Sequence, residues 1–223
     1  VLTALYSGRL LEFNSEKPDW ENRDYFLLSN GHACPALYTV LAYNGFFPVN
    51  KLKYLRKIDS GLEGHPKKGS LPGIEISSGS LGMGLSQGIG IALGLRLDKK
   101  KNRVIVMMSD GEQQEGSTWE AVMAASHFKL DNLTAIIDRN QVQIGGFTEE
   151  QMALEPLAKK YLSFNWKVIE INGHDFMQIF TAFRKSFENK KPTLIISNTK
   201  GCNGVILKQE KSYPHHPKIN YYF

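Results

Sequence analysis

The sequence predicts a three-layer α/β protein, in which helices cover both faces of a mostly parallel central sheet. An uninterrupted apolar run, RVIVMMS at 103–109, is typical of a parallel strand that is buried on both faces. A second strand, LTAIID at 133–138, follows it, and the segment between them, 117–128, reads as a helix. Strand, helix and strand over about 35 residues make a βαβ unit, which requires parallel strands.

The remaining elements extend this pattern in both directions. The helix at 117–128 begins with Ser117 and Glu120, which have the spacing of a capping box. The opening residues are amphipathic and begin as if within a helix. Because no repeat or low-complexity linker divides the sequence, we expect residues 1–223 to form a single domain. Further helices are predicted at 36–46, 86–97 and 175–188, and further strands at 166–171 and 193–197.

Composition excludes several classes of function. No stretch approaches the roughly 20 consecutive apolar residues of a membrane helix, and the opening segment lacks the features of a signal peptide. The two cysteines, Cys34 and Cys202, match no metal-ligand spacing, so we expect a reduced, cytoplasmic protein. The net charge of +5 is spread over short lysine clusters without a basic aromatic face, which argues against nucleic acid. Attraction for small phosphorylated substrates is the more modest inference.

Polar residues follow both strands of the βαβ unit. Asp110 comes directly after the first strand and Asn140 after the second, so both should emerge at the carboxyl edge of the sheet. Together with the backbone carbonyl of Val142 they would offer three oxygen ligands to Mg²⁺. Backbone N–H groups around Gly111 and Glu112 could then receive a diphosphate. Each segment alone is typical of an ordinary turn, but the matched placement favours a metal–diphosphate site.

Two segments of the sequence resemble those of a known family. SDGEQQEGSTWEA at 109–121 followed by DRNQVQIGG at 138–146 is similar to the thiamine diphosphate motif of transketolases, especially of their split, N-terminal subunits. Three ordered segments agree with it, so that the resemblance extends from Val1 to about Gly204. These segments are NRDYFLLSNGHACPALY at 22–38, EGHPKKGSLPGIEISSGSLGMGLSQGIGIALG at 63–94 and EINGHD at 170–175.

The resemblance implies a diphosphate-binding (PP-type) domain with an assigned set of site residues. Asp110, Asn140 and the Val142 carbonyl would hold Mg²⁺, or Ca²⁺ or Mn²⁺ in its place, with Gly111 and Glu112 at the diphosphate. Imidazoles suit the remaining work because they donate hydrogen bonds and exchange protons near neutral pH. The other implied roles are Gly79 and Leu81 at the aminopyrimidine, His32 at the diphosphate, His65 at the sugar donor, His215 at the cofactor and the reacting groups, and Glu115 at a subunit interface.

The implied reaction moves a two-carbon ketol unit from a ketose phosphate to an aldose or aldose phosphate. The family's pyrimidine-binding domain would come from a separate C-terminal subunit, in an assembly of two copies of each chain. A Ser-Gly-His-Pro-Gly-Gly segment that the family has before Val1 is absent from this sequence. Ser109, Met83 and Gly145 also depart from the usual pattern, and a Trp-His-Gly is missing near His215.

Other functions remain open. GMGLSQG at 82–88 approximates a dinucleotide-binding fingerprint, although no convincing strand precedes it. A synthase that condenses pyruvate with a triose phosphate, of the 1-deoxyxylulose-5-phosphate synthase kind, uses a related site. From a different class, a catalytically degenerate subunit could scaffold or regulate a partner, which Ser109 and Met83 favour and the intact Asp110 and Asn140 oppose.

Overall fold

A computed structural model of the chain describes residues 1–201 and 203. Its helices are α1 (Leu2–Leu5), α2 (Cys34–Tyr43), α3 (Gly84–Leu97), α4 (Gly116–His127), α5 (Thr148–Gln151), α6 (Leu157–Ser163) and α7 (Phe176–Glu188). Its strands are β1 (Tyr25–Leu28), β2 (Val104–Ser109), β3 (Leu133–Arg139), β4 (Val142–Gln143), β5 (Gly146–Phe147), β6 (Lys167–Asn172) and β7 (Thr193–Asn198). Short 3-10 helices occupy η1 (Gly31–Ala33), η2 (Val49–Tyr54) and η3 (Gly111–Gln114).

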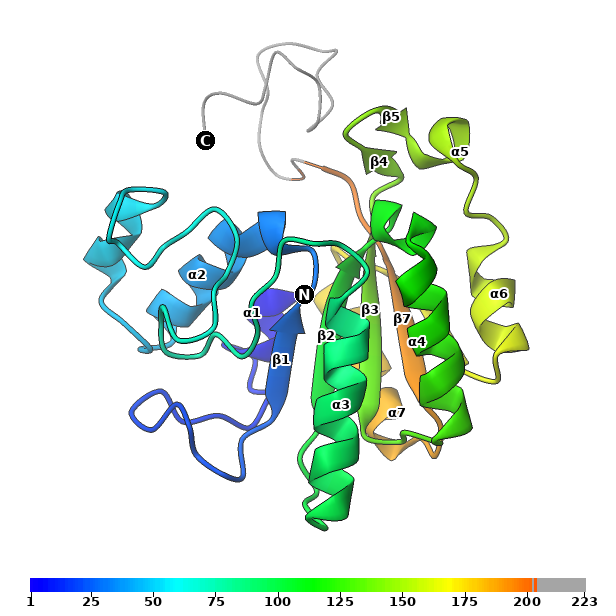
Figure 1. Cartoon of the computed structure of the whole chain (residues 1–223), viewed down its shortest axis with the longest axis horizontal. Helices are drawn as coiled ribbons and strands as arrows, with labels where there is room; N and C mark the ends of the chain where they lie inside the picture. Colours follow the sequence, from blue (N-terminus) through cyan, green and yellow to red (C-terminus); the bar gives the residue numbers. More distant parts are fainter. Residues whose placement is uncertain (202, 204–223) are drawn as a thin grey trace.

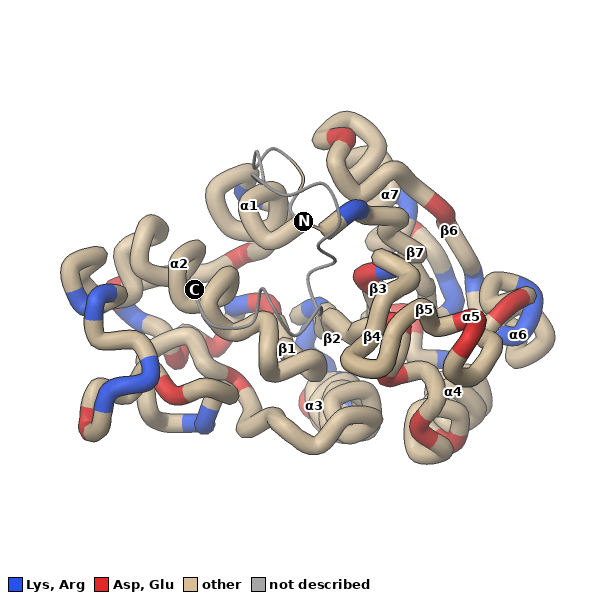
Figure 2. Tube along the Cα trace, turned by 90° about the horizontal axis from the view of Figure 1, so that it is seen from above, with Lys and Arg blue, Asp and Glu red and all other residues tan. Residues whose placement is uncertain are grey.

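Five strands form the central sheet in the order β1-β2-β3-β7-β6, and every neighbouring pair is parallel. All five therefore end at one carboxyl edge, which lies at the top of Figure 1 and faces the viewer in Figure 2. Strands β4 and β5 make a separate antiparallel hairpin above this edge. The predicted three-layer α/β fold with a mostly parallel sheet is confirmed.

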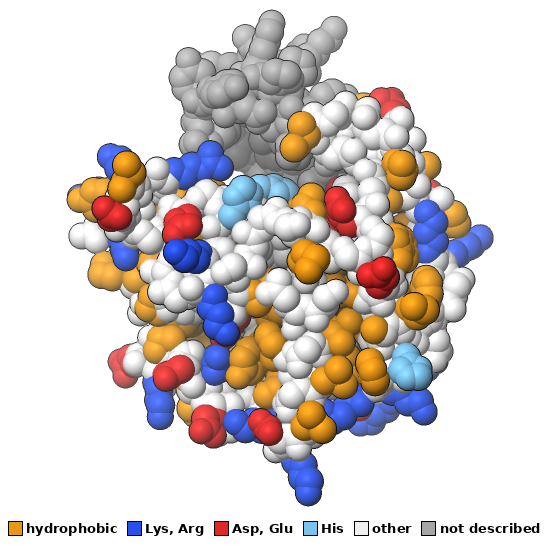
Figure 3. Space-filling model, viewed as in Figure 1, with side chains coloured by type: hydrophobic (Ala, Val, Ile, Leu, Met, Phe, Trp, Pro, Cys, Tyr) orange, Lys and Arg blue, Asp and Glu red, His pale blue; other side chains and the backbone are white. Residues whose placement is uncertain are grey.

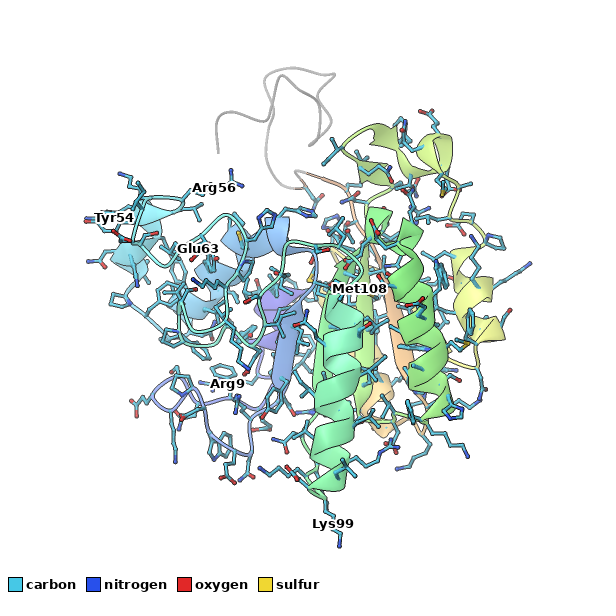
Figure 4. All side chains as sticks on the ribbon, viewed as in Figure 1. Arg9, Tyr54, Arg56, Glu63, Lys99 and Met108 are labelled. Atoms are coloured by element: carbon cyan, nitrogen blue, oxygen red, sulfur yellow. The ribbon has the colours of Figure 1, made fainter. Side chains whose placement is uncertain are left out.

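Two apolar clusters hold helices on opposite faces of the sheet. Alternate residues of β2 enter different clusters, because successive side chains of a strand point to opposite faces. Ile105 and Met107 join α1, α2 and α7, while Val106 and Met108 join α3, α4 and α6. Met108, near the carboxyl end of β2, is labelled beside the upper end of α3 in Figure 4. An uninterrupted apolar strand is thus required here, since both of its faces are covered.

The long predicted helices and strands lie where the apolar pattern predicts them, but several other elements differ. Strand β1, the β4–β5 hairpin and helices α5 and α6 were not expected, and the opening helix α1 is much shorter than the amphipathic segment suggested. The capping box is wrong: α4 begins at Gly116 with Glu115 as its N-cap, and no side chain caps it. The Ser117 hydroxyl instead donates to the backbone carbonyl of Gly82 (3.1 Å). No helix in the described part of the chain is long and apolar enough to cross a membrane.

Candidate functional site

Asp110 follows β2, and its carboxylate joins the ends of β2 and β3. One oxygen accepts a hydrogen bond from the backbone N–H of Gly111 (2.8 Å), and the other accepts from the N–H of Gln141 (2.6 Å). The residue is 1% exposed. Burial raises the pKa of the Asp110 carboxyl, and the hydrogen bonds from Gln141 and Gly111 partly oppose this. The two strand ends therefore meet at one edge, as their order in the sequence predicts.

Arg139, the last residue of β3, is a buried partner of Asp110 that the sequence patterns did not indicate. Its guanidinium donates to Asp110 (3.2 Å), to the Thr148 hydroxyl (2.8 Å) and to the carboxylates of Glu149 (2.9 Å) and Glu155 (3.1 Å). It is 4% exposed. The sequence could have indicated it, because Arg139 is a charged residue at the end of a buried strand and a buried charge has to be paired. Arg139 thus ties the segment after the β4–β5 hairpin to Asp110.

Asn140 and Val142 lie beside Asp110 on the turn that follows β3. The Asn140 side-chain oxygen accepts a hydrogen bond from the N–H of Val142 (2.9 Å), which folds the turn back on itself. Gln143 offers a buried side-chain oxygen that has no hydrogen-bond partner among the described residues, and a Cβ added at Gly111 would lie 3.1 Å from it. A cavity of about 920 Å³ adjoins this turn, with Asn140 and Val142 in its lining.

This donor set fits a hard divalent cation. A carboxylate, an amide oxygen and a backbone carbonyl are the oxygen types that Mg²⁺ prefers. No group of three or more His, Cys, Asp or Glu side chains in the described residues could hold a metal ion. That result does not bear on this site, which would use one carboxylate with an amide and a carbonyl. The unpartnered oxygen of Gln143 is further consistent with a polar group bound here.

Glu112, in η3, turns its side chain inward. It is 0% exposed. One carboxylate oxygen accepts hydrogen bonds from the Ser29 hydroxyl and from the N–H of Gly82 (2.8 Å), and the other accepts from the N–H of Ser109 (3.1 Å). Burial raises the pKa of the Glu112 carboxyl against the effect of these hydrogen bonds. The sequence had indicated a role only for the backbone N–H of this residue.

Three distant segments converge beside this edge around Gly31. A Cβ added at Gly31 would lie 2.7 Å from the Ser78 hydroxyl, 3.0 Å from the His65 ring and 3.2 Å from the N–H of Gly79. The Ser78 hydroxyl is buried, and no described residue forms a hydrogen bond with it. Gly79 has a φ of +150°, which favours glycine. The loops that carry His65 and Gly79 are therefore held against η1, next to His32.

The other predicted site residues occupy the same edge with differing exposure. His32 and His65 are exposed, Leu81 is half-buried, and Glu115 is exposed at the N-cap of α4. His215 lies outside the described residues. Among the departures from the family pattern, Ser109 is buried, Met83 is half exposed and Gly145 is exposed.

Two further histidines are not among the predicted site residues. His174 accepts a hydrogen bond from the backbone N–H of Lys200 (2.8 Å), which ties the turn between β6 and α7 to the segment after β7, and it lines the same cavity as Asn140 and Val142. His127 lies in the last turn of α4, where its ring contacts Phe128. The glycine-rich segment 82–88 opens α3, but no strand lies between η2 and α3. The dinucleotide fingerprint therefore lacks the strand that it requires.

Comparison with known proteins agrees with this geometry. The sequence model of the family described as "Transketolase, thiamine diphosphate binding domain" matches residues 1–219. The chain is 44% identical over 217 residues to an apulose-4-phosphate transketolase subunit of Phocaeicola vulgatus, covering 97% of this chain and 76% of the relative. It is 38% identical over 220 residues to 6-deoxy-6-sulfo-D-fructose transketolase subunit SqwG of Clostridium sp., covering 98% of this chain and 80% of the relative.

Solved structures give the same result for the fold. Transketolase from Leishmania mexicana superposes with a TM-score of 0.83 at 30% identity, over 89% of this chain and 32% of that one. Transketolase from Campylobacter jejuni superposes with a TM-score of 0.83 at 31% identity, over the same shares of the two chains. The chain therefore belongs to the transketolase family, within which it is similar to the N-terminal subunits of split enzymes.

Proposed function

We propose that this chain is the N-terminal subunit of a transketolase-type glycolaldehyde transferase that binds thiamine diphosphate and Mg²⁺ at the carboxyl edge of its sheet. It moves a two-carbon ketol unit from a ketose phosphate to an aldose or aldose phosphate. The observation that carries the proposal is the Asp110 carboxylate, which accepts a hydrogen bond from the N–H of Gln141 and so holds the turn after β2 against the turn after β3. Family membership supports the cofactor and the class of reaction.

Each residue at the edge has a role in this proposal. Asp110, Asn140 and the Val142 carbonyl hold the cation, whose charge lets an anionic diphosphate lie beside a carboxylate. Bound thiamine diphosphate supplies the nucleophilic carbon and the electron sink that ketol transfer needs. His32 donates a hydrogen bond to the diphosphate. His65 donates to sugar hydroxyls and exchanges protons at its imidazole nitrogen, for which its exposed position suits it.

Further groups implied by the family belong to the same proposal. The backbone of Gly79 and the side chain of Leu81 contact the aminopyrimidine, while the N–H groups of Gly111 and Glu112 face the diphosphate. His215 completes the substrate side. The cation is Mg²⁺, with Ca²⁺ or Mn²⁺ as substitutes, because all three accept oxygen ligands.

A second polypeptide with a pyrimidine-binding domain completes the enzyme in this proposal, in an assembly of two copies of each chain. The similar proteins of Phocaeicola vulgatus and Clostridium sp. are named as transketolase subunits. A face of α3 and α4 supports a docking surface: Leu97 is 82% exposed and Met123 is 57% exposed, and nothing lies within 4 Å of a Cβ added at Gly90 or Gly94. Figure 3 shows hydrophobic side chains gathered over these helices. Glu115, at the start of α4, adjoins this face.

The metal site is tested by calorimetry of thiamine diphosphate binding at limiting and at saturating Mg²⁺. Asp110→Ala and Asn140→Ala should abolish Mg²⁺-dependent binding while leaving the circular dichroism spectrum unchanged. Asp175→Ala is the matched control, because this carboxylate accepts from the N–H groups of Met177 and Gln178 at the start of α7 and lies outside the proposed site. Unchanged cofactor affinity in Asp110→Ala at limiting Mg²⁺ would contradict the proposal.

The partner is tested by activity. The purified chain alone should show little or no ketol transfer, and adding the C-terminal subunit should restore turnover in a saturable, stoichiometric way. Turnover by this chain alone would rule out the split arrangement. Cofactor binding without turnover in the presence of the partner would instead favour a regulatory subunit.

A further inference from the structure

The buried side-chain carboxylate of Glu112 has no ion-pair partner among the described residues and no role in the proposed function, which uses only the backbone N–H of this residue. No ion pair within the described residues involves it, and it is fully shielded from solvent. A buried charge without a cation is costly unless its hydrogen bonds are complete. The carboxylate of Glu112 meets this condition with three donors, namely one hydroxyl and two backbone N–H groups.

The three donors belong to three different segments around the proposed cofactor site. Ser29 follows β1 and precedes His32, Gly82 follows Leu81 in the loop before α3, and Ser109 ends β2 next to Asp110. The Ser29 hydroxyl also accepts a hydrogen bond from the N–H of Gly84 (3.0 Å), so both of its hydrogen-bonding functions are used. One side chain thus connects the segments that carry His32, Leu81 and Asp110.

The neighbouring backbone leaves little room for another arrangement. A Cβ added at Gly84 would overlap the Ser29 side chain, and one added at Gly82 would lie 2.5 Å from the Ser117 hydroxyl. Gly82 also has a φ of +79°, which favours glycine. These close approaches mean that the loop before α3 packs directly against Ser29 and Ser117, with no space for a side chain at Gly82 or Gly84. Among the hydrogen bonds that hold this loop, the N–H of Gly82 is directed at Glu112 and the N–H of Gly84 at Ser29, whose hydroxyl in turn donates to Glu112.

A carboxylate is required because both of its oxygens must accept. A glutamine at the same position offers one accepting oxygen, so its NH₂ group would face either the N–H of Ser109 or that of Gly82. A buried donor left without an acceptor is destabilising. The lost hydrogen bond would therefore weaken the contact between two segments, and the hydrogen bonds within each helix and strand would stay intact.

We propose that Glu112 is a positioning residue, which fixes the segments carrying His32 and Leu81 relative to Asp110 and so sets the affinity for thiamine diphosphate. This inference rests on the proposed function. The Glu112 side chain does not contact the metal or the substrate in this scheme. It acts by positioning the backbone segments that carry the binding residues. Its replacement should therefore weaken cofactor binding although every residue that contacts the cofactor or metal is still present.

The test compares Glu112→Gln with Asp24→Asn. Asp24 is also a buried carboxylate, at the opposite edge of the sheet, where it accepts from the N–H groups of Glu12 (3.0 Å) and Arg103 (2.8 Å). Both variants should lower the melting temperature of the cofactor-free chain. Only Glu112→Gln should weaken thiamine diphosphate binding at saturating Mg²⁺, by at least about tenfold. The turnover number with the partner present should change less than the cofactor affinity.

Amide hydrogen exchange supplies a readout that a general loss of stability does not move. In Glu112→Gln the N–H of Gly82 or Ser109 should exchange faster than in Asp24→Asn at matched stability. If Glu112→Gln fails to fold, Ser29→Ala removes a single donor and should still weaken cofactor binding. Wild-type affinity in a folded Glu112→Gln would overturn the inference alone. A wild-type chain that binds no thiamine diphosphate would overturn the proposed function and this inference with it.

Discussion

Replacing Gly88 by alanine should push α3 away from the sheet. Gly88 faces β2, and a Cβ built there would lie 2.5 Å from a methyl carbon of Val106, which is fully buried. Carbon atoms in contact are normally about 3.5–4.0 Å apart, so the helix must move by about 1 Å or force Val106 from its rotamer. Such overpacking costs about 1–3 kcal/mol. Alanine recovers about 1 kcal/mol of that through its higher helix propensity.

The net effect is a loss of about 1 kcal/mol in the free energy of unfolding. For a chain of this size that loss lowers the melting temperature by about 2–4 °C. Gly94→Ala on the same helix is the matched control, because nothing lies within 4 Å of its Cβ and only the propensity term applies. It should raise the melting temperature of the isolated chain by a similar amount. Calorimetric or denaturant unfolding of both variants that finds Gly88→Ala as stable as Gly94→Ala would refute the reasoning.

Three further predictions concern the proposed function. His65→Ala should lower turnover with ketose donors far more than it weakens cofactor binding; unchanged donor kinetics would return His65 to a structural role. Leu97→Glu and Met123→Glu should impair association with the C-terminal subunit in sedimentation experiments. Ile58→Glu is the control, because Ile58 is 93% exposed and lies outside the docking face, and it should leave association unchanged. Equal effects of all three substitutions would contradict the docking face. Burial raises the pKa of the Asp110 carboxyl, and the metal needs this group as a carboxylate. As the pH is lowered, Mg²⁺-dependent cofactor binding should therefore weaken at a higher pH than the one at which an exposed aspartate titrates. Binding that is lost only in the range of an exposed aspartate would contradict this.

The fold was predictable where the apolar pattern was long and uninterrupted. Strands β2 and β3 are covered on both faces, so their residues had to be mostly apolar and the pattern was plain. Strand β1 has four residues, too few to separate a strand from a buried loop. The capping box failed because Ser117 was free to bond a distant carbonyl, at Gly82, which sequence spacing cannot reveal.

The site was predictable only where it follows from strand order. Asp110 and Asn140 follow neighbouring parallel strands, so their proximity followed from the βαβ unit. The inward turn of Glu112 depends on donors far away in the chain, and no local pattern indicates them. Arg139 was overlooked for a similar reason, since its acidic partners lie on two other segments, with Asp110 after β2 and Glu149 and Glu155 after the β4–β5 hairpin.

The wide sequence separation of the contacts at Glu112 has a consequence for how the chain folds. Ser29 and Glu112 are 83 residues apart, and Ser29 and Gly84 are 55 apart. Contacts of this range form only after long loops close, which makes parallel sheets slow to assemble. The edge that would receive the cofactor should therefore be among the last parts to become native. Thiamine diphosphate and Mg²⁺ added at the start of refolding should then leave the refolding rate unchanged. The same ligands, bound to the folded protein, should slow its unfolding.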